Sequence, residues 1–422
     1  MDAPTKITEE ALSFLCPETR ANPFPIYKYL RDEQPVYFDP KVSMYIVSRY
    51  EDIRRVLSDP KTFSSASWKD KVRNQLEDEH AMTLRKRFEA QGGFVPPPNV
   101  AAMDDPRHRE VRALFEMAFR PARVKAMEDD IKRIAASLTD HLAEKRCCEL
   151  VREFSIPFPM TVIFNQVGAR LEDMWQIKEW LDAIIERVSF CQTPEQQIRS
   201  VDKTVEAQNY FKGIVENLRG NPNGTVLSDL VSTPLADGTM LTEQELITNI
   251  IDILFQAGTE TTTTAITSGV RLLGEQPGLF DRLRADPNRV RCFVEEVLRL
   301  ESPAQGIFRL VTEDVELHGV KLPSGSVLHL RVGAANRDET KFASPDRLDL
   351  ERKSASSHMA FGAGIHHCVG AVLARSELNW AFKTFVDRFS AIRISESQGE
   401  VTFLNNYMFR AINELHVEFE PA

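Results

Sequence analysis

Most of the middle of the chain carries apolar residues at intervals of three and four positions. Between residue 103 and about residue 300, segments such as "HREVRALFEMAF" and "MEDDIKRIAASLTDHLAEKR" repeat this spacing, which predicts amphipathic helices. Near residues 22–60 and again over 303–422, runs rich in aromatic and β-branched residues, such as "VYFD", "MYIVSR" and "SVLHLRVG", predict strands. No internal repeat or linker separates these parts. We therefore expect a single domain over residues 1–422, mainly α with small β-sheets (an α+β fold).

One predicted helix, at residues 242–274, is apolar on almost every side, which is typical of a helix buried at the centre of a fold. Thr242 and Glu245 form a capping box at its start, and it must end before Pro277. We expect this segment to be the central helix of the domain.

The middle of this helix breaks its own pattern with "AGTETTTTA". Gly258 and the threonines are poor helix formers, and Glu260 needs water or a partner in a buried position. Two interpretations are open. The threonines can hydrogen-bond to the carbonyl one turn earlier, or the helix opens at Gly258 so that Glu260 and Thr261 supply protons to a reaction.

The composition excludes several classes of protein. The 422 residues are 42% hydrophobic, which predicts a large core, and the formal net charge of −10 argues against a general nucleic-acid binder. The six cysteines form no C-x-x-C pair, which indicates a reducing compartment. There is no signal peptide and no uncharged apolar run of the ~18–20 residues that a membrane span needs. We expect a soluble, cytoplasmic protein.

A loop at residues 358–370, "HMAFGAGIHHCVG", concentrates histidines and glycines around one cysteine, Cys368. It is open to three interpretations: a buried free cysteine, a zinc site shared with the histidines, or a thiolate ligand of haem iron. Zinc is disfavoured because adjacent side chains point in different directions. A thiolate is favoured where a glycine loop meets a helix N-terminus. Gly362 and Gly364 would let the backbone fold under the sulfur, and Phe361 would shield it.

The loop resembles the haem-binding loop of the cytochrome P450 family, F-G-x-G-x-[HR]-x-C-x-G, at every fixed position. "AGTETT" (257–262) resembles the oxygen-activating motif of that family, and "DPRHREVR" (105–112) resembles the helix that covers one haem face. "EEVLR" contains the E-x-x-R motif as Glu296 and Arg299. The segments "HMAFG" and "SP" resemble the soluble, ferredoxin-dependent bacterial members.

The resemblance implies the cytochrome P450 fold, with haem b between the central long helix and the helix after the cysteine loop. Cys368 would be the axial thiolate ligand, and Glu260 and Thr261 would form an acid–alcohol proton relay. Glu296, Arg299 and Arg347 would form a structural lock, although Leu348 stands where the family usually has Phe. The expected cofactor contacts are His108, Arg112, Ala257, Gly258, Arg309, His358, Phe361, Gly362, His366, Cys368 and Gly370.

The resemblance also implies a monooxygenase that inserts one oxygen atom of O2 into an organic substrate. Electrons must come from outside, because the chain has neither a G-x-G-x-x-G after a strand nor an iron–sulfur cysteine run. We expect a ferredoxin with its NAD(P)H-dependent reductase. A local basic cluster is a candidate docking patch for it: Arg107, Arg109, Arg112, Arg120, Arg123 and Lys125. A peroxygenase driven by hydrogen peroxide and a haem-binding sensor or carrier remain alternatives.

The substrate pocket is expected above the central helix, under residues 65–102 and the helices around 172–218. Candidate lining residues are Phe94, Ile253, Gln256, Ala257 and Ile307, most of them apolar, which favours a small, largely apolar substrate. The run Arg85, Lys86 and Arg87 either binds a substrate carboxylate or is solvated surface.

Overall fold

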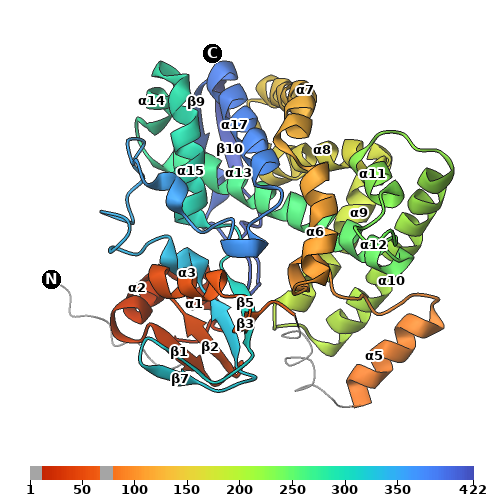
Figure 1. The fold of residues 1–422 in the computed structure, drawn as a ribbon. Helices are drawn as coiled ribbons and strands as arrows, with labels where there is room; N and C mark the ends of the chain where they lie inside the picture. Colours follow the sequence, from red (N-terminus) through yellow and green to blue (C-terminus); the bar gives the residue numbers. More distant parts are fainter. Residues whose placement is uncertain (1–11, 67–78) are drawn as a thin grey trace.

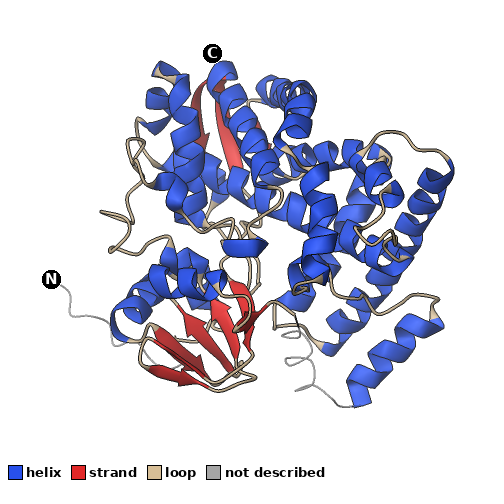
Figure 2. Cartoon of the chain, viewed as in Figure 1, coloured by secondary structure: helices blue, strands red, loops and turns tan. Residues whose placement is uncertain are grey.

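The computed structural model describes residues 12–66 and 79–422, and Figure 1 shows how its elements are arranged. A large helical body makes up most of the molecule, and a five-stranded sheet lies at its lower edge in Figure 2. The α-helices are α1 (Pro17–Ala21), α2 (Phe24–Glu33), α3 (Tyr50–Ser58), α5 (Glu79–Ala90), α6 (Arg107–Ala118), α7 (Pro121–Lys145), α8 (Pro157–Val167), α9 (Met174–Ile185), α10 (Pro194–Gly220), α11 (Val226–Ser232), α12 (Glu243–Asn249), α13 (Gly258–Glu275), α14 (Leu279–Ala285), α15 (Val290–Glu301), α16 (Val332–Ala335) and α17 (Ala371–Arg388).

The larger sheet joins the two strand-rich parts of the sequence. Its strand order is β1-β2-β8-β5-β3, and a second sheet has the order β4-β10-β9. The strands are β1 (Val36–Asp39), β2 (Met44–Val47), β3 (Phe63–Ser64), β4 (Cys147–Glu149), β5 (Ile307–Val311), β6 (Val315–Leu317), β7 (Val320–Leu322), β8 (Val327–Leu330), β9 (Phe389–Ile394) and β10 (His416–Pro421). Strand β2 pairs in parallel with β8, so a hairpin near the start of the chain is completed by strands more than 250 residues later.

The central helix is broken into three segments rather than continuous. A capping box of Thr242 and Glu245 starts α12 as expected, but residues Ile250–Ala257 form a π-helix, η5, before α13 begins at Gly258. A π-helix has i→i+5 hydrogen bonds and occurs mostly as short insertions at functional sites. The irregular stretch thus lies next to the glycine where the sequence predicted a local opening.

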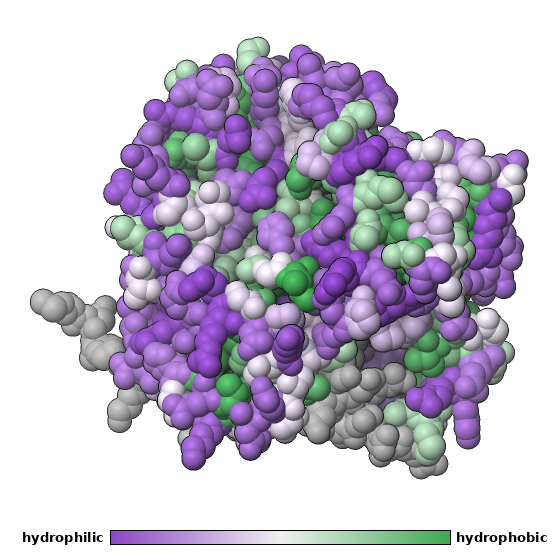
Figure 3. All heavy atoms as spheres, viewed as in Figure 1, coloured by the Kyte–Doolittle hydropathy of each residue, from purple (hydrophilic) through white to green (hydrophobic). Residues whose placement is uncertain are grey.

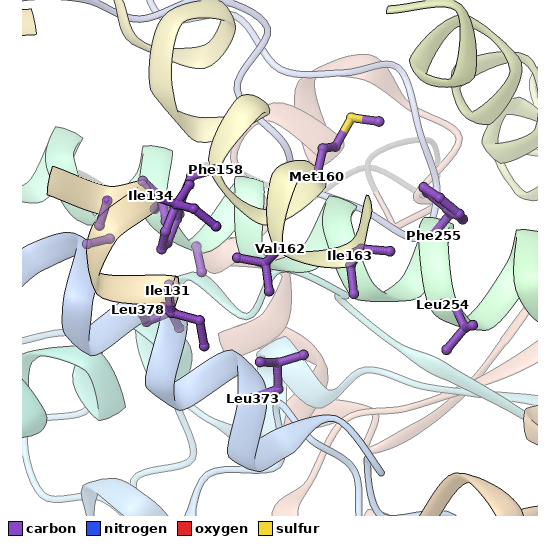
Figure 4. Packing of buried hydrophobic residues seen from close by; sticks show 14 of the residues in the cluster. Ile131, Ile134, Phe158, Met160, Val162, Ile163, Leu254, Phe255, Leu373 and Leu378 are labelled. Carbon is purple, nitrogen blue, oxygen red and sulfur yellow. The ribbon is translucent and has the colours of Figure 1, made fainter. Parts of the chain in front are cut away.

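Close packing fixes α13 within the helical body. A Cβ built on Gly269 would lie 2.3 Å from the ring of Phe382 in α17, so the two helices approach as closely as a missing side chain allows. Figure 4 shows the neighbouring core, where side chains of α7, α8, η5 and α17 interdigitate; Ile131, Phe158, Val162, Leu254 and Leu378 are among them. This core holds the central helix against the helix that follows the cysteine loop.

No helix within the described residues is both long enough and apolar enough to cross a membrane.

Candidate active site

The loop before α17 is folded tightly by its own backbone. The N–H of Cys368 donates to the carbonyl of Phe361 at 2.8 Å, and Gly362 and Gly364 have φ of 68° and 69°. A Cβ on Gly364 would lie 2.2 Å from the carbonyl oxygen of Leu57 in α3. Glycine is therefore required at residue 364 both by its left-handed conformation and by this contact. The fold delivers Cys368 to the start of α17.

The Cys368 thiol is free, and the residue is exposed in this structure. Burial raises the pKa of the thiol, whereas the Gly370 N–H and the charges of Arg112 and Arg375 lower it. The donors around the sulfur favour its thiolate form, as a metal ligand requires.

Three basic side chains gather beside the cysteine loop, and of these His108 lies 3.5 Å from a carboxylate, that of Asp105. The rings of His108 in α6 and His366 lie 3.9 Å apart, and the Nε2 atoms of both have no hydrogen-bond partner among the described residues. Arg309 in β5 is only 5% exposed, and its one hydrogen bond goes to the carbonyl of Phe308 at 2.7 Å. Burial lowers the pKa of Arg309 to about 10, and burial together with Arg309 lowers that of His366 to about 3.

Such a cluster fits a bound group that carries carboxylates, because the buried Arg309 cation has no ion pair with a described residue and the Nε2 atoms of His108 and His366 have no hydrogen-bond partner there. The two propionates of haem would meet this need beside the cysteine that would bind the iron. Zinc fits less well, because the described residues contain no group of three or more His, Cys, Asp and Glu side chains placed to hold a metal ion. Haem is therefore the cofactor that the side chains present best accommodate.

Arg112 in α6 lies at the same loop but is already hydrogen-bonded. Its Nη2 donates to the carbonyl of His367 at 2.7 Å, and its Nε donates to Glu116 at 2.7 Å. The side chain thus ties α6 to the cysteine loop. The third guanidinium nitrogen of Arg112, Nη1, has no hydrogen-bond partner among the described residues. It therefore remains free to bind a propionate.

His358 was expected to contact the cofactor, and in this structure both its ring nitrogens are bonded to protein groups. Its Nε2 lies 3.1 Å from Glu295 in α15, and its Nδ1 accepts from the Ala360 N–H at 3.2 Å. Glu295 also binds Arg375 at 2.7 Å, and the guanidinium of Arg375 lies over the ring of Phe361. His358 therefore links α15 to the cysteine loop, and both its nitrogens are used.

The expected structural lock forms, with one change of partner. Glu296 and Arg299 are fully buried and joined at 2.6 Å and 2.9 Å. The second arginine is Arg352, whose Nε lies 3.0 Å from Glu296, whereas the exposed Arg347 contributes only its main-chain carbonyl. The Asp349 N–H donates to Glu296 at 2.8 Å, and Arg352, three residues later in the chain, reaches the carboxylate in place of Arg347, two residues earlier.

The back-bonding interpretation of the threonine run holds for part of it, including Thr261. The Thr261 hydroxyl donates to the carbonyl of Ala257 at 2.9 Å, across the junction between η5 and α13, and Thr264 makes the same bond to Glu260 at 2.8 Å. Thr262 and Thr263 instead reach Glu377 of α17 and the carbonyl of Ser155. Thr261 is therefore held at the irregular part of the helix, with Ala257 accessible one turn before it.

Glu260 is not free but paired with a lysine from a neighbouring helix. Lys178 in α9 lies 2.9 Å from Glu260 and also binds Asp182. Burial opposes the charge of Lys178, but Glu260 and Asp182 raise its pKa above the usual value. Sequence reasoning missed Lys178, because an i,i+4 pair with Asp182 has the pattern of an ordinary solvated helix face.

The residues expected to line the substrate pocket come from separate elements. Ile253 and Gln256 are partly buried on η5, and a Cβ on Gly362 would lie 3.4 Å from Ile307 of β5. Phe94 is bonded through its main chain to Gln208 of α10, at 3.0 Å and 2.7 Å.

Charges expected on the surface are mostly paired. In the basic cluster, Arg107 binds Glu245 and Glu110, Arg109 binds Asp105, Arg112 binds Glu116, Arg123 binds Asp229 and Lys125 binds Glu128.

Arg87 is held by Asp202 at 2.5 Å and 2.7 Å, so it is not available to a substrate carboxylate.

Comparison with known proteins agrees with this geometry. Residues 36–415 match the family model described as Cytochrome P450. The chain is 34% identical to Cytochrome P450 109 of Bacillus spizizenii over 88% of this chain and 86% of that protein. It is 30% identical to the Cytochrome P450 monooxygenase PikC of Streptomyces venezuelae, over 94% and 91% of the two chains.

A solved structure, cytochrome P450 CREJ in complex with (4-ethylphenyl) dihydrogen phosphate, superposes with a TM-score of 0.87 at 28% identity, covering 95% of this chain and 98% of that one. The match therefore extends over the cysteine loop, the interrupted central helix and the buried glutamate–arginine lock together. With its thiol, the basic side chains beside it and these relatives, the chain belongs to the cytochrome P450 family of monooxygenases.

Proposed function

We propose that this protein binds haem b through the Cys368 thiolate and oxidises a small, largely apolar substrate with O2 and electrons from a ferredoxin. The observation that carries the cofactor assignment is the buried Arg309, together with the unpartnered Nε2 atoms of His108 and His366, beside the free Cys368 thiol. Haem held by a thiolate would supply the oxygen chemistry.

The residues of this chain would hold that group in place. Cys368 would bind the iron, with the Gly370 N–H supporting the negative charge on sulfur. His108, Arg309 and His366 would pair with the propionates, which would give Arg309 an anionic partner and the two Nε2 atoms hydrogen-bond acceptors. Arg112 would keep α6 against the loop, so that the cofactor is covered on this side.

Thr261 and Glu260 would move protons on the opposite side of the haem. The Thr261 hydroxyl donates to the Ala257 carbonyl, so the lone pairs of its oxygen remain available to accept a hydrogen bond. Glu260 is paired with Lys178, and Asp182 binds the same lysine on the outer side of α9. A proton passed to Thr261 would therefore come along a chain of buried ionic groups, with Glu260 as its inner member.

The site for the electron donor is proposed on the face where α6 meets the cysteine loop and α17. Most cations there are already paired, but Met117 of α6 and Val372 of α17 are each 42% exposed. Figure 3, viewed as in Figure 1, shows hydrophobic residues near the middle of this face with hydrophilic residues around them. This arrangement supports docking of the ferredoxin through an apolar centre and a charged rim. The rate of reduction should then depend less on salt concentration than it would if the ferredoxin docked on an open basic patch.

An apolar substrate is supported by Ile253 and Ile307, which are partly accessible on η5 and β5. The ligand of the CREJ structure, an ethyl-substituted aromatic phosphate, shows that a relative with a very similar backbone binds a molecule with an apolar ring.

Two measurements on haem-loaded protein test the proposal. The reduced protein exposed to carbon monoxide should show the strongly red-shifted Soret band of thiolate-bound haem, and C368H should lose it; a histidine-type band in the wild type would overturn the assignment. Oxidation of a bound test compound with NADH, ferredoxin and reductase should exceed oxidation with hydrogen peroxide alone. The reverse order would favour a peroxygenase, and no turnover with either would favour a sensor or carrier.

A further inference from the structure

Glu295 of α15 binds two side chains near the cysteine, and the chemistry above gives it no role. Its carboxylate accepts hydrogen bonds from Nε of Arg375 at 2.7 Å and from Nη2 at 3.1 Å. Nε2 of His358 lies 3.1 Å from the same carboxylate and is the donor, because Nδ1 accepts from the Ala360 N–H. Burial opposes the charge of Glu295, but the hydrogen bonds from His358 and Arg375 lower its pKa to about 2. The carboxylate is therefore ionised at neutral pH.

Both side chains that Glu295 binds also lie against the ring of Phe361 in the cysteine loop. The guanidinium carbon of Arg375 is 4.5 Å from the centre of this ring and lies over its face. The ring centre of His358 is 5.6 Å from that of Phe361. A cation over the face of an aromatic ring is attracted to it. The ring of Phe361 is thus placed by two side chains that share one carboxylate.

Phe361 is in turn joined to the cysteine through the main chain. Its carbonyl accepts the Cys368 N–H at 2.8 Å, and the chain turns directly after it at Gly362, where φ is 68°. A shift of residue 361 would therefore move the group that holds the Cys368 main chain. Burial raises the pKa of the Cys368 thiol, and the charge of Arg375 is among those that lower it. A series of direct contacts thus leads from Glu295 through Arg375 and Phe361 to Cys368.

Burial alone does not confine Arg375 to this place. Its side chain is 32% exposed, so the guanidinium would be free to turn into water if nothing held it. The bidentate bond to Glu295 prevents this, because a planar fork bound at two points keeps one orientation. An ion pair that served only to join α15 to α17 would not need a ring against the face of the guanidinium.

We propose that Glu295 is a positioning residue for the cysteine ligand. By holding Arg375 over Phe361, it keeps a positive charge beside the loop and so raises the reduction potential of iron bound at Cys368. The inference rests on the proposed function, since it requires haem iron at this cysteine. A fixed nearby cation favours the reduced form of the iron, which carries one electron more. Glu295 itself contacts neither substrate nor cofactor and acts only through Arg375.

The test is the midpoint reduction potential of the haem-loaded, substrate-free protein at one pH and one ionic strength. R375Q should shift the reduction equilibrium about 3- to 30-fold towards the ferric form, which is roughly 30–90 mV for a one-electron couple. E295Q and R375K should shift it in the same direction, because neither keeps the charged fork that fixes a planar cation over the ring. R388Q is the matched control and should leave the potential unchanged, since Arg388 ends α17 at the opposite end from the loop and pairs with Asp140.

A higher potential in E295Q, or an unchanged potential in R375K, would overturn the proposal, because the charges would then act at a distance without Glu295 fixing the position of Arg375.

The haem-free protein gives a second measurement. In urea unfolding, the losses of stability in E295Q and R375Q should not add in the double variant E295Q/R375Q, because either change alone breaks the same contact. Additive losses would also overturn the proposal. The carbon monoxide spectrum separates this result from the haem assignment. A thiolate-type band in the wild type with unshifted potentials in the variants removes the role of Glu295 alone. A histidine-type band removes the haem assignment and with it the role of Glu295 at the iron.

Discussion

Lys178 of α9 lies 2.9 Å from the carboxylate of Glu260 in α13, so the acid of the proposed relay is held by a cation from another helix. Both side chains are largely shielded from water. Removing one member of such a pair leaves the other charge without a partner, which is costly, whereas removing both is often nearly neutral.

We expect K178M to lower the free energy of unfolding by about 2–4 kcal/mol. This loss is somewhat smaller than the loss on breaking a fully buried ion pair, because the Glu260 side chain remains slightly exposed to water. The double variant K178M/E260Q should recover most of this loss. Urea unfolding of the two single variants and the double variant measures the coupling. Additive losses would show that the pair is not energetically linked.

Arg309 should affect the haem-free and haem-loaded protein in opposite directions. In R309L, the haem-free protein should become more stable by ~1–3 kcal/mol, because a buried cation without a carboxylate is removed. The loaded variant should lose haem to apomyoglobin about 10- to 100-fold faster. Urea unfolding and haem-transfer kinetics report the two effects, and unchanged haem retention would argue against a propionate contact.

The two arginines near Glu296 should differ in importance. R352A should lower the free energy of unfolding by about 2–3 kcal/mol, because it removes a buried partner of Glu296 and hydrogen bonds to three carbonyls. R347A should change it by less than about 0.5 kcal/mol, since that side chain is exposed and only its carbonyl is used. Equal losses in urea unfolding would contradict this assignment.

Gly364 and Gly319 both have a left-handed backbone conformation, so substitutions at the two residues can be compared directly. Both have positive φ, 69° and 78°, but a Cβ on Gly364 would meet the Leu57 carbonyl at 2.2 Å, whereas nothing lies within 4 Å of one on Gly319. G319A should therefore cost about 1 kcal/mol of backbone strain. G364A should cost several times more and lower the haem content of the purified protein. Similar haem content in both variants would show that the loop tolerates displacement from α3.

Glu377 of α17 should make the protein less stable as pH rises. Burial raises the pKa of this carboxyl to about 8, and the hydrogen bond from Thr262 opposes the rise. The folded state thus keeps a proton that the unfolded state loses above a pH of about 4.5, so unfolding becomes easier between pH 4.5 and 8. The change is at most ~3 kcal/mol between pH 4.5 and 7.

E377Q should remove this contribution. The advantage of the variant over the wild type in urea unfolding should grow from pH 5 to pH 8 and then level off. An advantage that does not change with pH would mean that Glu377 titrates near its ordinary value when the protein is folded.

The sequence predicted best what short segments determine by themselves. The cysteine loop, the capping box at Thr242 and the strand-rich ends all depend on neighbouring residues or on local periodicity, and the structure has them where they were expected. The family comparison confirms the fold that the loop implied.

What the sequence did not predict depends on contacts between distant segments. Lys178 pairs with Glu260, and Arg352 replaces Arg347, because packing decides which of several nearby charges reaches a carboxylate. The basic cluster on α6 and α7 looked open in the sequence but is largely neutralised by carboxylates, including Glu245 and Asp229 from other helices. The π-helix before Gly258 likewise has no distinctive composition, since its residues also suit a regular buried helix.

The Phe94 N–H donates to Gln208, and the Gln208 amide donates to the Phe94 carbonyl, so the side chain of Phe94 takes no part in either bond. A substitution at residue 94 would thus alter the side chain that this segment presents and leave its attachment to α10 in place. A change at residue 208 would do the opposite. The shape of the segment and its attachment are consequently set by separate residues, so natural or laboratory evolution can adjust one without disturbing the other.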